Sequence, residues 1–180
     1  MKSSKIKKTL YNTPLWKVLG CVLHHPDLMM RGSQITTLLP NISQSSIYNA
    51  IRALEKIGVL IREKNRDGFS LNIDHAWLRY LMVADTLLTL QPLIQTLAPI
   101  AVKVLLFGSR ATGQYTSTSD YDLFVVSARD REVRRKLSQS TLKRHVQLIL
   151  KTPEEWLDLR HTEPEFYQSL QQGIVLWDRK

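Results

Sequence analysis

Two aspartates one residue apart, Asp120 and Asp122, open an apolar run in the second half of the chain. An earlier apolar run, Val102–Phe107, leads into Gly108-Ser109, and ten residues separate this pair from Asp120. The pattern predicts a strand, a tight turn, a loop and a second strand. Because side chains alternate along a strand, Asp120 and Asp122 should lie on one face, close together.

Two carboxylates at such a distance repel each other unless a cation lies between them. Mg²⁺ is the natural candidate, because it binds a couple of carboxylates together with phosphate oxygens. Gly108 lets the backbone approach a phosphate closely, and Ser109 at the start of a helix offers a hydroxyl and free N–H groups. A bare Asp-x-Asp is also compatible with a solvated strand end.

Taken together, Gly108-Ser109 and Asp120-Tyr121-Asp122 resemble the signature of the polymerase-beta-type nucleotidyltransferase superfamily. The accompanying Arg110, Gly113 and Ser119 are similar to its minimal prokaryotic members, and the resemblance covers roughly residues 100–178. The resemblance implies that the nucleotide is bound by Gly108, Ser109, Arg110 and Ser119. It also implies that Mg²⁺ is bound by Asp120 and Asp122.

The family also carries a third carboxylate on a later strand, where it holds the metal that activates the attacking hydroxyl. The matching strand here is expected at 146–150, and the matching position is Gln147. The implied catalytic set is therefore Asp120, Asp122 and Gln147. An amide carries no charge, so this departure weakens the case for catalysis more than the case for nucleotide binding.

Three short helices and a hairpin are expected in the first part of the chain. Thr13 and Ser43 are good N-caps for the first and third helices, and the second follows Ser33. Two extended runs, 59–64 and 69–72, flank an Asp-Gly pair typical of a hairpin. Residues 13–73 resemble the winged helix-turn-helix DNA-binding domains of prokaryotic regulators.

The third helix of that domain displays polar residues opposite its apolar face. Gln, Asn and Arg can read base edges, whereas Ser, Tyr and the basic residues of the hairpin suit phosphates. The predicted DNA contacts are Gln44, Ser45, Tyr48, Asn49, Arg52, Arg62, Lys64 and Arg66. A winged helix used only for protein contacts is the alternative.

The sequence thus predicts an α+β protein with two domains, an N-terminal winged helix-turn-helix and a C-terminal mixed-sheet nucleotidyltransferase fold. We place the first domain at 1–73, a helical linker at 74–98 with a break or kink at Pro92, and the second domain at 99–180. The linker has apolar residues on too many sides for one stripe, so it joins the domains, supports a homodimer, or does both. A basic helix is expected at 129–144 and a capping box at Thr152 to Glu155.

Charge and composition fit a polyanionic partner. Lys plus Arg number 25 and Asp plus Glu 16, a net charge of +9. The single cysteine excludes an internal disulfide or a Cys-cluster zinc site, and His24, His25 and His145 lack further ligands at metal spacing. With no signal peptide or membrane span in the sequence, we expect a cytoplasmic protein.

Two functions remain open. In the first, the chain binds DNA and a Mg–NTP complex, with ATP the first candidate, and transfers a nucleoside monophosphate to a hydroxyl acceptor such as a protein. In the second, it is a transcriptional regulator whose transferase-like domain senses the nucleotide with little or no turnover. Gln147 favours the second function.

Overall fold

The computed structural model describes residues 12–62 and 67–179. By their internal contacts these residues form two compact units. The N-terminal unit comprises the chain up to Asp85 together with Tyr115–Thr118, and the C-terminal unit comprises Thr86–Gln114 and the chain from Ser119 onwards. The boundary between Asp85 and Thr86 lies within the helix Ala76–Leu97.

The described part of the N-terminal unit begins with three helices, and two of them start at the predicted caps. They are α2 (Pro14–Leu23), α3 (Gly32–Leu38) and α4 (Gln44–Lys56). Thr13 accepts a hydrogen bond from the Trp16 amide at 3.4 Å, and Ser43 accepts one from the Ser46 amide at 3.3 Å. Each cap satisfies an amide that lacks a partner within its helix.

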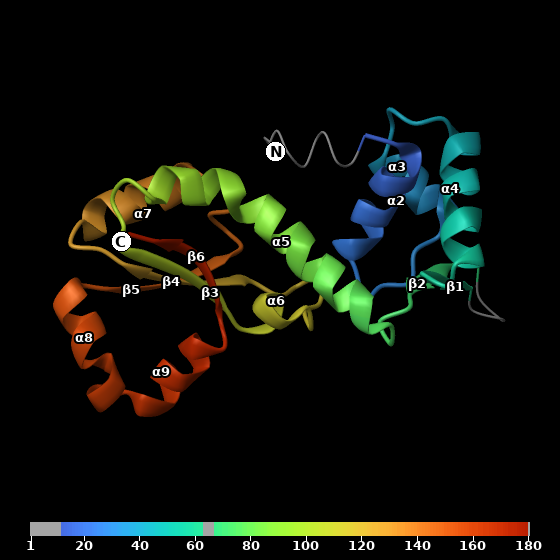
Figure 1. Cartoon of the computed structure of the whole chain (residues 1–180). Coiled ribbons are helices and arrows are strands. Elements are labelled where there is room, and N and C mark those ends of the chain that lie inside the picture. Colours follow the sequence, from blue (N-terminus) through green and yellow to red (C-terminus); the bar gives the residue numbers. More distant parts are fainter. Residues whose placement is uncertain (1–11, 63–66, 180) are drawn as a thin grey trace. The chain divides into compact units, whose positions relative to one another are not determined.

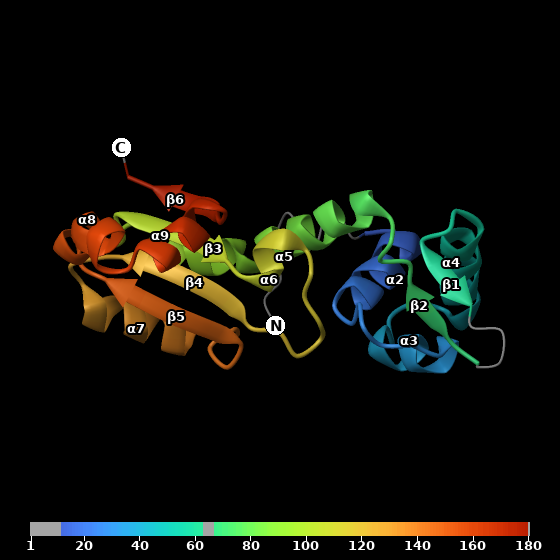
Figure 2. The ribbon, with the colours of Figure 1, turned by 90° about the horizontal axis from the view of Figure 1, so that it is seen from below.

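A two-stranded antiparallel hairpin follows the helices, with β1 (Leu60–Arg62) pairing with β2 (Phe69–Leu71) (Figure 2). Phe69 also bridges to Met30, just before α3. Apolar side chains from all of these elements form one core, in which Val18, Ile35 and Ile47 are completely buried. The hairpin is therefore fixed to the helices by both backbone pairing and apolar packing.

The helix α5 (Ala76–Leu97) runs through Pro92 as one continuous element. Its first part contributes Leu78 and Met82 to the core of the N-terminal unit. Its second part contributes Leu90, Leu93 and Leu97 to the core of the C-terminal unit. Apolar residues around this helix are explained by two different cores, one at each end.

The C-terminal unit is built on a mixed four-stranded sheet in the order β5-β4-β3-β6. The strands are β3 (Lys103–Phe107), β4 (Tyr121–Val126), β5 (Val146–Lys151) and β6 (Ile174–Asp178). Strand β3 is antiparallel to β4 and β6, whereas β4 and β5 are parallel. The predicted mixed sheet is confirmed.

Helices cover both faces of this sheet (Figure 1). The second half of α5 and α7 (Asp130–Gln139) share one core with one face. The other face packs against α8 (Pro153–Thr162) and α9 (Pro164–Gln171), and a single turn of helix, α6 (Ser109–Thr112), follows β3. The capping box that opens α8 at Thr152 and Glu155 is confirmed.

Three expectations are wrong: the second helix begins at Gly32 and not after Ser33, Pro92 does not break α5, and the basic helix is shorter than predicted. The basic helix expected to reach residue 144 ends at Gln139. Ser140 adopts an extended conformation, and its hydroxyl accepts a hydrogen bond from the Leu142 amide at 3.1 Å. A serine side chain that binds nearby backbone competes with the helix in this way. The turn brings Leu142 into the core, where it is buried.

Among the residues that the structure describes, no helix combines the length and apolar character that a membrane span requires.

Candidate functional site

The candidate site lies at one end of the sheet, where β3 ends and the neighbouring strands β4 and β5 begin. Phe107, the last residue of β3, pairs with Asp122 of β4. Asp122 in turn pairs with Gln147 of β5. Asp122, the predicted metal ligand, therefore lies beside Gln147 on one side and beside the end of β3, next to Gly108, on the other.

Gly108 is required at this position for two independent reasons. Its φ of 72° and ψ of −160° belong to a region that residues with a side chain rarely adopt. In addition, a methyl group on its Cα would overlap Oδ2 of Asp122 and lie 3.0 Å from Cγ. The carboxylate of Asp122 thus lies directly against the Gly108 backbone.

The environment of Asp122 raises the pKa of its carboxyl group above the usual range. Partial burial is the main cause, the negative charge of Asp120 adds to it, and the positive charge of Arg110 opposes both. Asp120 is exposed and immediately precedes β4. The two carboxylates are close enough to repel, and a divalent cation between them would relieve that repulsion.

This arrangement predicts that Asp122→Asn increases the free energy of unfolding when no divalent metal is present. Because the pKa of this carboxyl group is raised in the folded state, the protein loses stability as the pH rises from the ordinary pKa of the group through its raised pKa, where the disfavoured charged form appears. Asn cannot ionise, so the difference should be present near neutral pH and vanish in acid, where Asp122 is protonated. Urea unfolding with a chelator would measure it.

Asp158→Asn, a change at an exposed position on α8, is the matched control. Its free energy of unfolding should equal that of the unchanged protein both near neutral pH and in acid. Equal stability of Asp122→Asn and the unchanged protein near neutral pH would contradict the proposed repulsion.

Arg110 is turned into the protein. It is 6% exposed, and its Nε and Nη2 donate to the Ser119 carbonyl at 3.0 and 2.8 Å. Its guanidinium also lies 4.1 Å from the centre of the Tyr121 ring. Arg110 therefore contacts both neighbours of Asp120, Ser119 through hydrogen bonds and Tyr121 through its ring. A direct nucleotide contact by Arg110 or by the Ser119 side chain stays a prediction.

A cavity of about 360 Å³ opens beside the Gly108-Ser109 turn. Its lining contains no charged side chain, and Asp120 and Asp122 are not part of it. Ser169 and Gln172, from the end of α9, line it and were not identified from the sequence. They arrive there because β6 pairs with β3, and nothing in the local sequence indicates that pairing.

The loop between Gly108-Ser109 and Asp120 belongs partly to the N-terminal unit. Tyr115 is buried there, and its hydroxyl donates to the Leu23 carbonyl at 3.0 Å. The amide and hydroxyl of Ser117 donate to the two carboxylate oxygens of Asp27 at 2.6 and 3.1 Å. The segment between the two halves of the motif is thus fixed at both Tyr115 and Ser117.

The predicted DNA-contacting residues of α4 share one exposed face. Ile47, Ala50, Ile51 and Leu54 point into the core, and the opposite side carries Gln44, Ser45, Tyr48, Asn49 and Arg52, all exposed. The Tyr48 ring lies so close to Gly32 that a methyl group there would meet it at 2.8 Å. Tyr48 is therefore held in place by the start of α3.

In the hairpin, Arg62 is already engaged with protein groups. Its Nε is 2.9 Å from Oε1 of Glu55, and its guanidinium lies 4.5 Å from the centre of the Phe69 ring. Lys64 and Arg66 lie outside the described residues, so their predicted phosphate contacts are not addressed by the structure.

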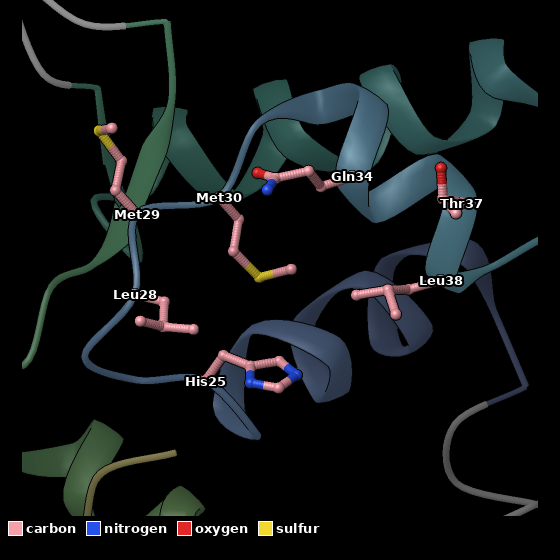
Figure 3. Close-up of a pocket in the computed structure, with 7 residues that line it drawn as sticks. All are labelled: His25, Leu28, Met29, Met30, Gln34, Thr37 and Leu38. Carbon is pink, nitrogen blue, oxygen red and sulfur yellow. The ribbon is translucent and has the colours of Figure 1, made fainter. Parts of the chain in front are cut away.

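The N-terminal unit holds an apolar cavity of about 410 Å³, shown in Figure 3. His25, Leu28, Met30 and Leu38 surround it, and none of the predicted DNA- or nucleotide-binding residues lines it. Nε2 of the neighbouring His24 lies 3.5 Å from Oδ2 of the buried Asp85. Among the described residues, no group of three or more His, Cys, Asp or Glu is arranged to hold a metal ion.

Comparison with known proteins bears on the C-terminal part of the chain. Residues 89–180 match the family model described as polymerase beta, nucleotidyltransferase. A crystal structure from Sulfolobus solfataricus, described as a candidate nucleotidyltransferase, is 21% identical, covers 58% of this chain and 85% of its own, and superposes with a TM-score of 0.31. The search of curated proteins gave no match.

A mixed sheet with a Gly-Ser turn beside paired aspartates defines a nucleotidyltransferase-type domain. The match to the family model begins inside α5 and covers half of the chain, so the protein belongs to the polymerase beta nucleotidyltransferase family. Domains of this family generally use divalent metals and act on nucleotides.

Proposed function

We propose that this chain is a DNA-binding regulator whose nucleotidyltransferase domain binds a Mg–NTP complex and turns it over slowly or not at all. The pairing of Asp122 with Gln147 carries this proposal, since it supports an amide where the family's third carboxylate would lie. Binding needs the aspartate pair, whereas efficient transfer also needs the third negative ligand.

Two residues would hold the metal, and the donor set suits it. Asp120 and Asp122 offer carboxylate oxygens, which Mg²⁺ prefers, and a cation between them would relieve the repulsion that Asp120 exerts on the charged form of Asp122. Bound Mg²⁺ would neutralise the phosphates and polarise the α-phosphoryl group. Gly108 allows close approach of the triphosphate, Ser109 offers its hydroxyl and amide, and Arg110 positions Asp120 through Ser119.

Transfer of a nucleoside monophosphate is the second candidate function, and the intact aspartate pair favours it. The acceptor hydroxyl would lose its proton and its oxygen would bond to the α-phosphorus. The bond between the α-phosphorus and the oxygen that joins it to the β-phosphate would break, and pyrophosphate would leave. A protein hydroxyl is the proposed acceptor, and ATP is the proposed donor.

Gln147→Asp should separate these two functions. A third carboxylate would hold a second metal and stabilise the deprotonated hydroxyl, so we expect transfer to rise by about tenfold or more, equivalent to about 1.4 kcal/mol of barrier. Mg²⁺ affinity in the nucleotide complex should also increase. Labelled NTP incubated with cell extract would report transfer, and calorimetry would report metal binding.

Gln139→Asp, an exposed change at the end of α7, is the control and should alter neither quantity. Fast transfer by the unchanged protein, with no effect of Gln147→Asp, would contradict the assigned role of Gln147 and favour the second function.

The N-terminal unit is proposed to be a winged helix that binds DNA. Three helices, the hairpin and the bridge from Met30 to Phe69 support this arrangement, with α4 as the recognition helix and the hairpin as the wing. The exposed face of α4 supplies groups that can read bases, and the net charge of +9 suits a polyanion. A homodimer through the segment 74–98 is part of this proposal.

Arg52→Ala should weaken binding to a selected DNA duplex by about 1–3 kcal/mol if Arg52 contacts a base. The loss should depend on the base sequence, and the affinity of the unchanged protein should fall steeply with salt, because phosphate contacts release counterions. Fluorescence anisotropy over a salt series would measure both effects.

Arg160→Ala on α8 removes an exposed arginine outside the N-terminal unit and serves as the control. If Arg52→Ala and Arg160→Ala have the same affinity for the selected duplex as the unchanged protein, α4 is not the recognition helix.

A further inference from the structure

Positive charge in the C-terminal part of the chain is concentrated in one segment, residues 129–145. This segment holds seven Lys and Arg residues and two Asp and Glu residues. Residues 86–128 hold two basic and two acidic residues, and residues 146–180 hold four basic and six acidic ones. The segment 129–145 therefore supplies all of the net positive charge of this part of the chain.

The helix α7 leaves a row of arginines exposed, on the side of the sheet away from α8 and α9 (Figure 2). Val133 is completely buried, and Leu137, one turn later, packs against the same core. Arg131 and Arg135 are also one turn apart, and both are exposed on the side of α7 that faces away from the core. The apolar side of α7 thus directs these arginines outward, where a ligand can reach them.

Helix stability does not explain these two arginines. Asp130 and Glu132 are already paired with other arginines, with nitrogen-to-oxygen distances of 2.5 and 3.9 Å. Neither Arg131 nor Arg135 has an acidic partner in the described part of the chain. Like charges four residues apart disfavour a helix, and Arg131 lies in the first turn, where the helix dipole disfavours positive charge. Their positions therefore cost helix stability, which a bound anion would restore.

The turn that follows α7 extends the exposed positive charge to the candidate site. Leu142 is buried and holds the turn against the core. Lys143 and Arg144, the next two residues, are exposed, and neither has an acidic partner among the residues that the structure describes. The carbonyl of His145 then accepts a hydrogen bond from the Tyr121 amide at 2.7 Å. Because Tyr121 separates the paired aspartates in the sequence, the turn ends beside the predicted metal ligands.

We propose that Arg131, Arg135, Lys143 and Arg144, here called the basic surface, bind the phosphate backbone of duplex DNA. This role rests on the proposed function, in which α4 binds DNA, and adds a second contact surface in the C-terminal unit. Arginine and lysine contacts to phosphates hold a protein on DNA without reading its sequence. The helix α7 is about 15 Å long, and a duplex presents one phosphate charge for about every 1.7 Å of its axis, so phosphates are available along the whole row.

An acidic protein is the alternative partner, and the composition of the segment favours DNA. The centre of a protein interface is apolar and rich in aromatic residues. Within the described chain, none of the exposed large apolar side chains lies in residues 129–145. The uncharged exposed residues there include Ser138, Gln139 and Thr141, whose hydroxyl and amide groups suit phosphate oxygens.

Arg135→Gln and Arg144→Gln, introduced singly into the full chain, test the proposal. Fluorescence anisotropy over a salt series would measure affinity for the selected duplex and for a mixed-sequence duplex. We expect each variant to bind both duplexes more weakly by the same factor, about fivefold at about 0.1 M salt. The slope of log affinity against log salt should fall in magnitude by about one. Arg160→Gln on α8 removes the same charge outside the basic surface and should change neither quantity.

Circular dichroism would establish that the variants are folded, and Arg131→Gln replaces Arg135→Gln if that variant does not fold. Affinities and salt slopes equal to those of Arg160→Gln would overturn the proposal. Equal competition by polyglutamate of the same charge would also overturn it and would assign the surface to an acidic protein. Arg52→Ala should give a loss that depends on base sequence, so a failure of the basic surface is distinguished from a failure of α4 as the recognition helix.

Discussion

Replacing Asp120 and Asp122 together by alanine is expected to abolish Mg²⁺-dependent NTP binding. On the paired row Phe107–Asp122–Gln147, Asp122 is the carboxylate, Asp120 lies two residues before it, and the neighbouring strand contributes an amide, Gln147. Loss of groups that merely orient metal ligands already costs about 10–100-fold in affinity, so loss of both ligands should cost at least about 100-fold. Calorimetric titration of NTP with and without Mg²⁺ would measure this.

The double variant should remain folded, because Asp120 is exposed and the partly buried Asp122 carboxylate is disfavoured where it lies. Asp158→Ala controls for the loss of an exposed carboxylate elsewhere in the same unit. Unchanged Mg–NTP affinity in the double variant would place the nucleotide site in another part of the molecule.

Gly108→Ala should be the most damaging single methyl group that can be added to the site. The conformation of Gly108, with φ of 72° and ψ of −160°, costs a residue with a side chain about 1–3 kcal/mol. Overlap of the new methyl group with the Asp122 carboxylate adds to that, and crowding of this kind typically costs about 1–3 kcal/mol more. We therefore expect a loss of about 2–6 kcal/mol in the free energy of unfolding, with displacement of Asp122 and loss of Mg–NTP binding.

Gly58→Ala is a close control for this experiment. Gly58 has a φ of 73°, nearly the same as Gly108, but a methyl group there would meet only Nε2 of His75 at an ordinary 3.6 Å. It should cost only the conformational part and leave nucleotide binding intact. Equal losses of stability in the two variants would mean that Asp122 moves aside without cost.

Local chemistry explains which parts of this fold could be predicted from sequence. The caps at Thr13, Ser43 and Thr152 were predicted correctly because each depends on residues three positions apart. The strand that carries Gln147 was expected at 146–150 and lies at Val146–Lys151, whereas its parallel pairing with β4, which sets Gln147 opposite Asp122, was not predicted. Nor was the end of α7, because a serine side chain competed with helix formation.

Features that depend on distant parts of the chain could not be predicted. The inward turn of Arg110 requires the Ser119 carbonyl and the Tyr121 ring in their folded positions. Ser169 and Gln172 reach the cavity only through the pairing of β6 with β3. The same pairing explains Gly173, where a methyl group would lie 2.7 Å from the Leu106 carbonyl oxygen.

The threading of the chain through its two units has a consequence for how such a protein can be recombined. A C-terminal fragment that begins after residue 98 would lack Leu90, Leu93 and Leu97, which fill the core of the C-terminal unit. A cut within α5 at residue 85 would still leave Tyr115 on the downstream fragment and its acceptor, the Leu23 carbonyl, on the upstream one. Neither half is a portable module, so gene fusion or excision at a single point should yield fragments that need each other in trans.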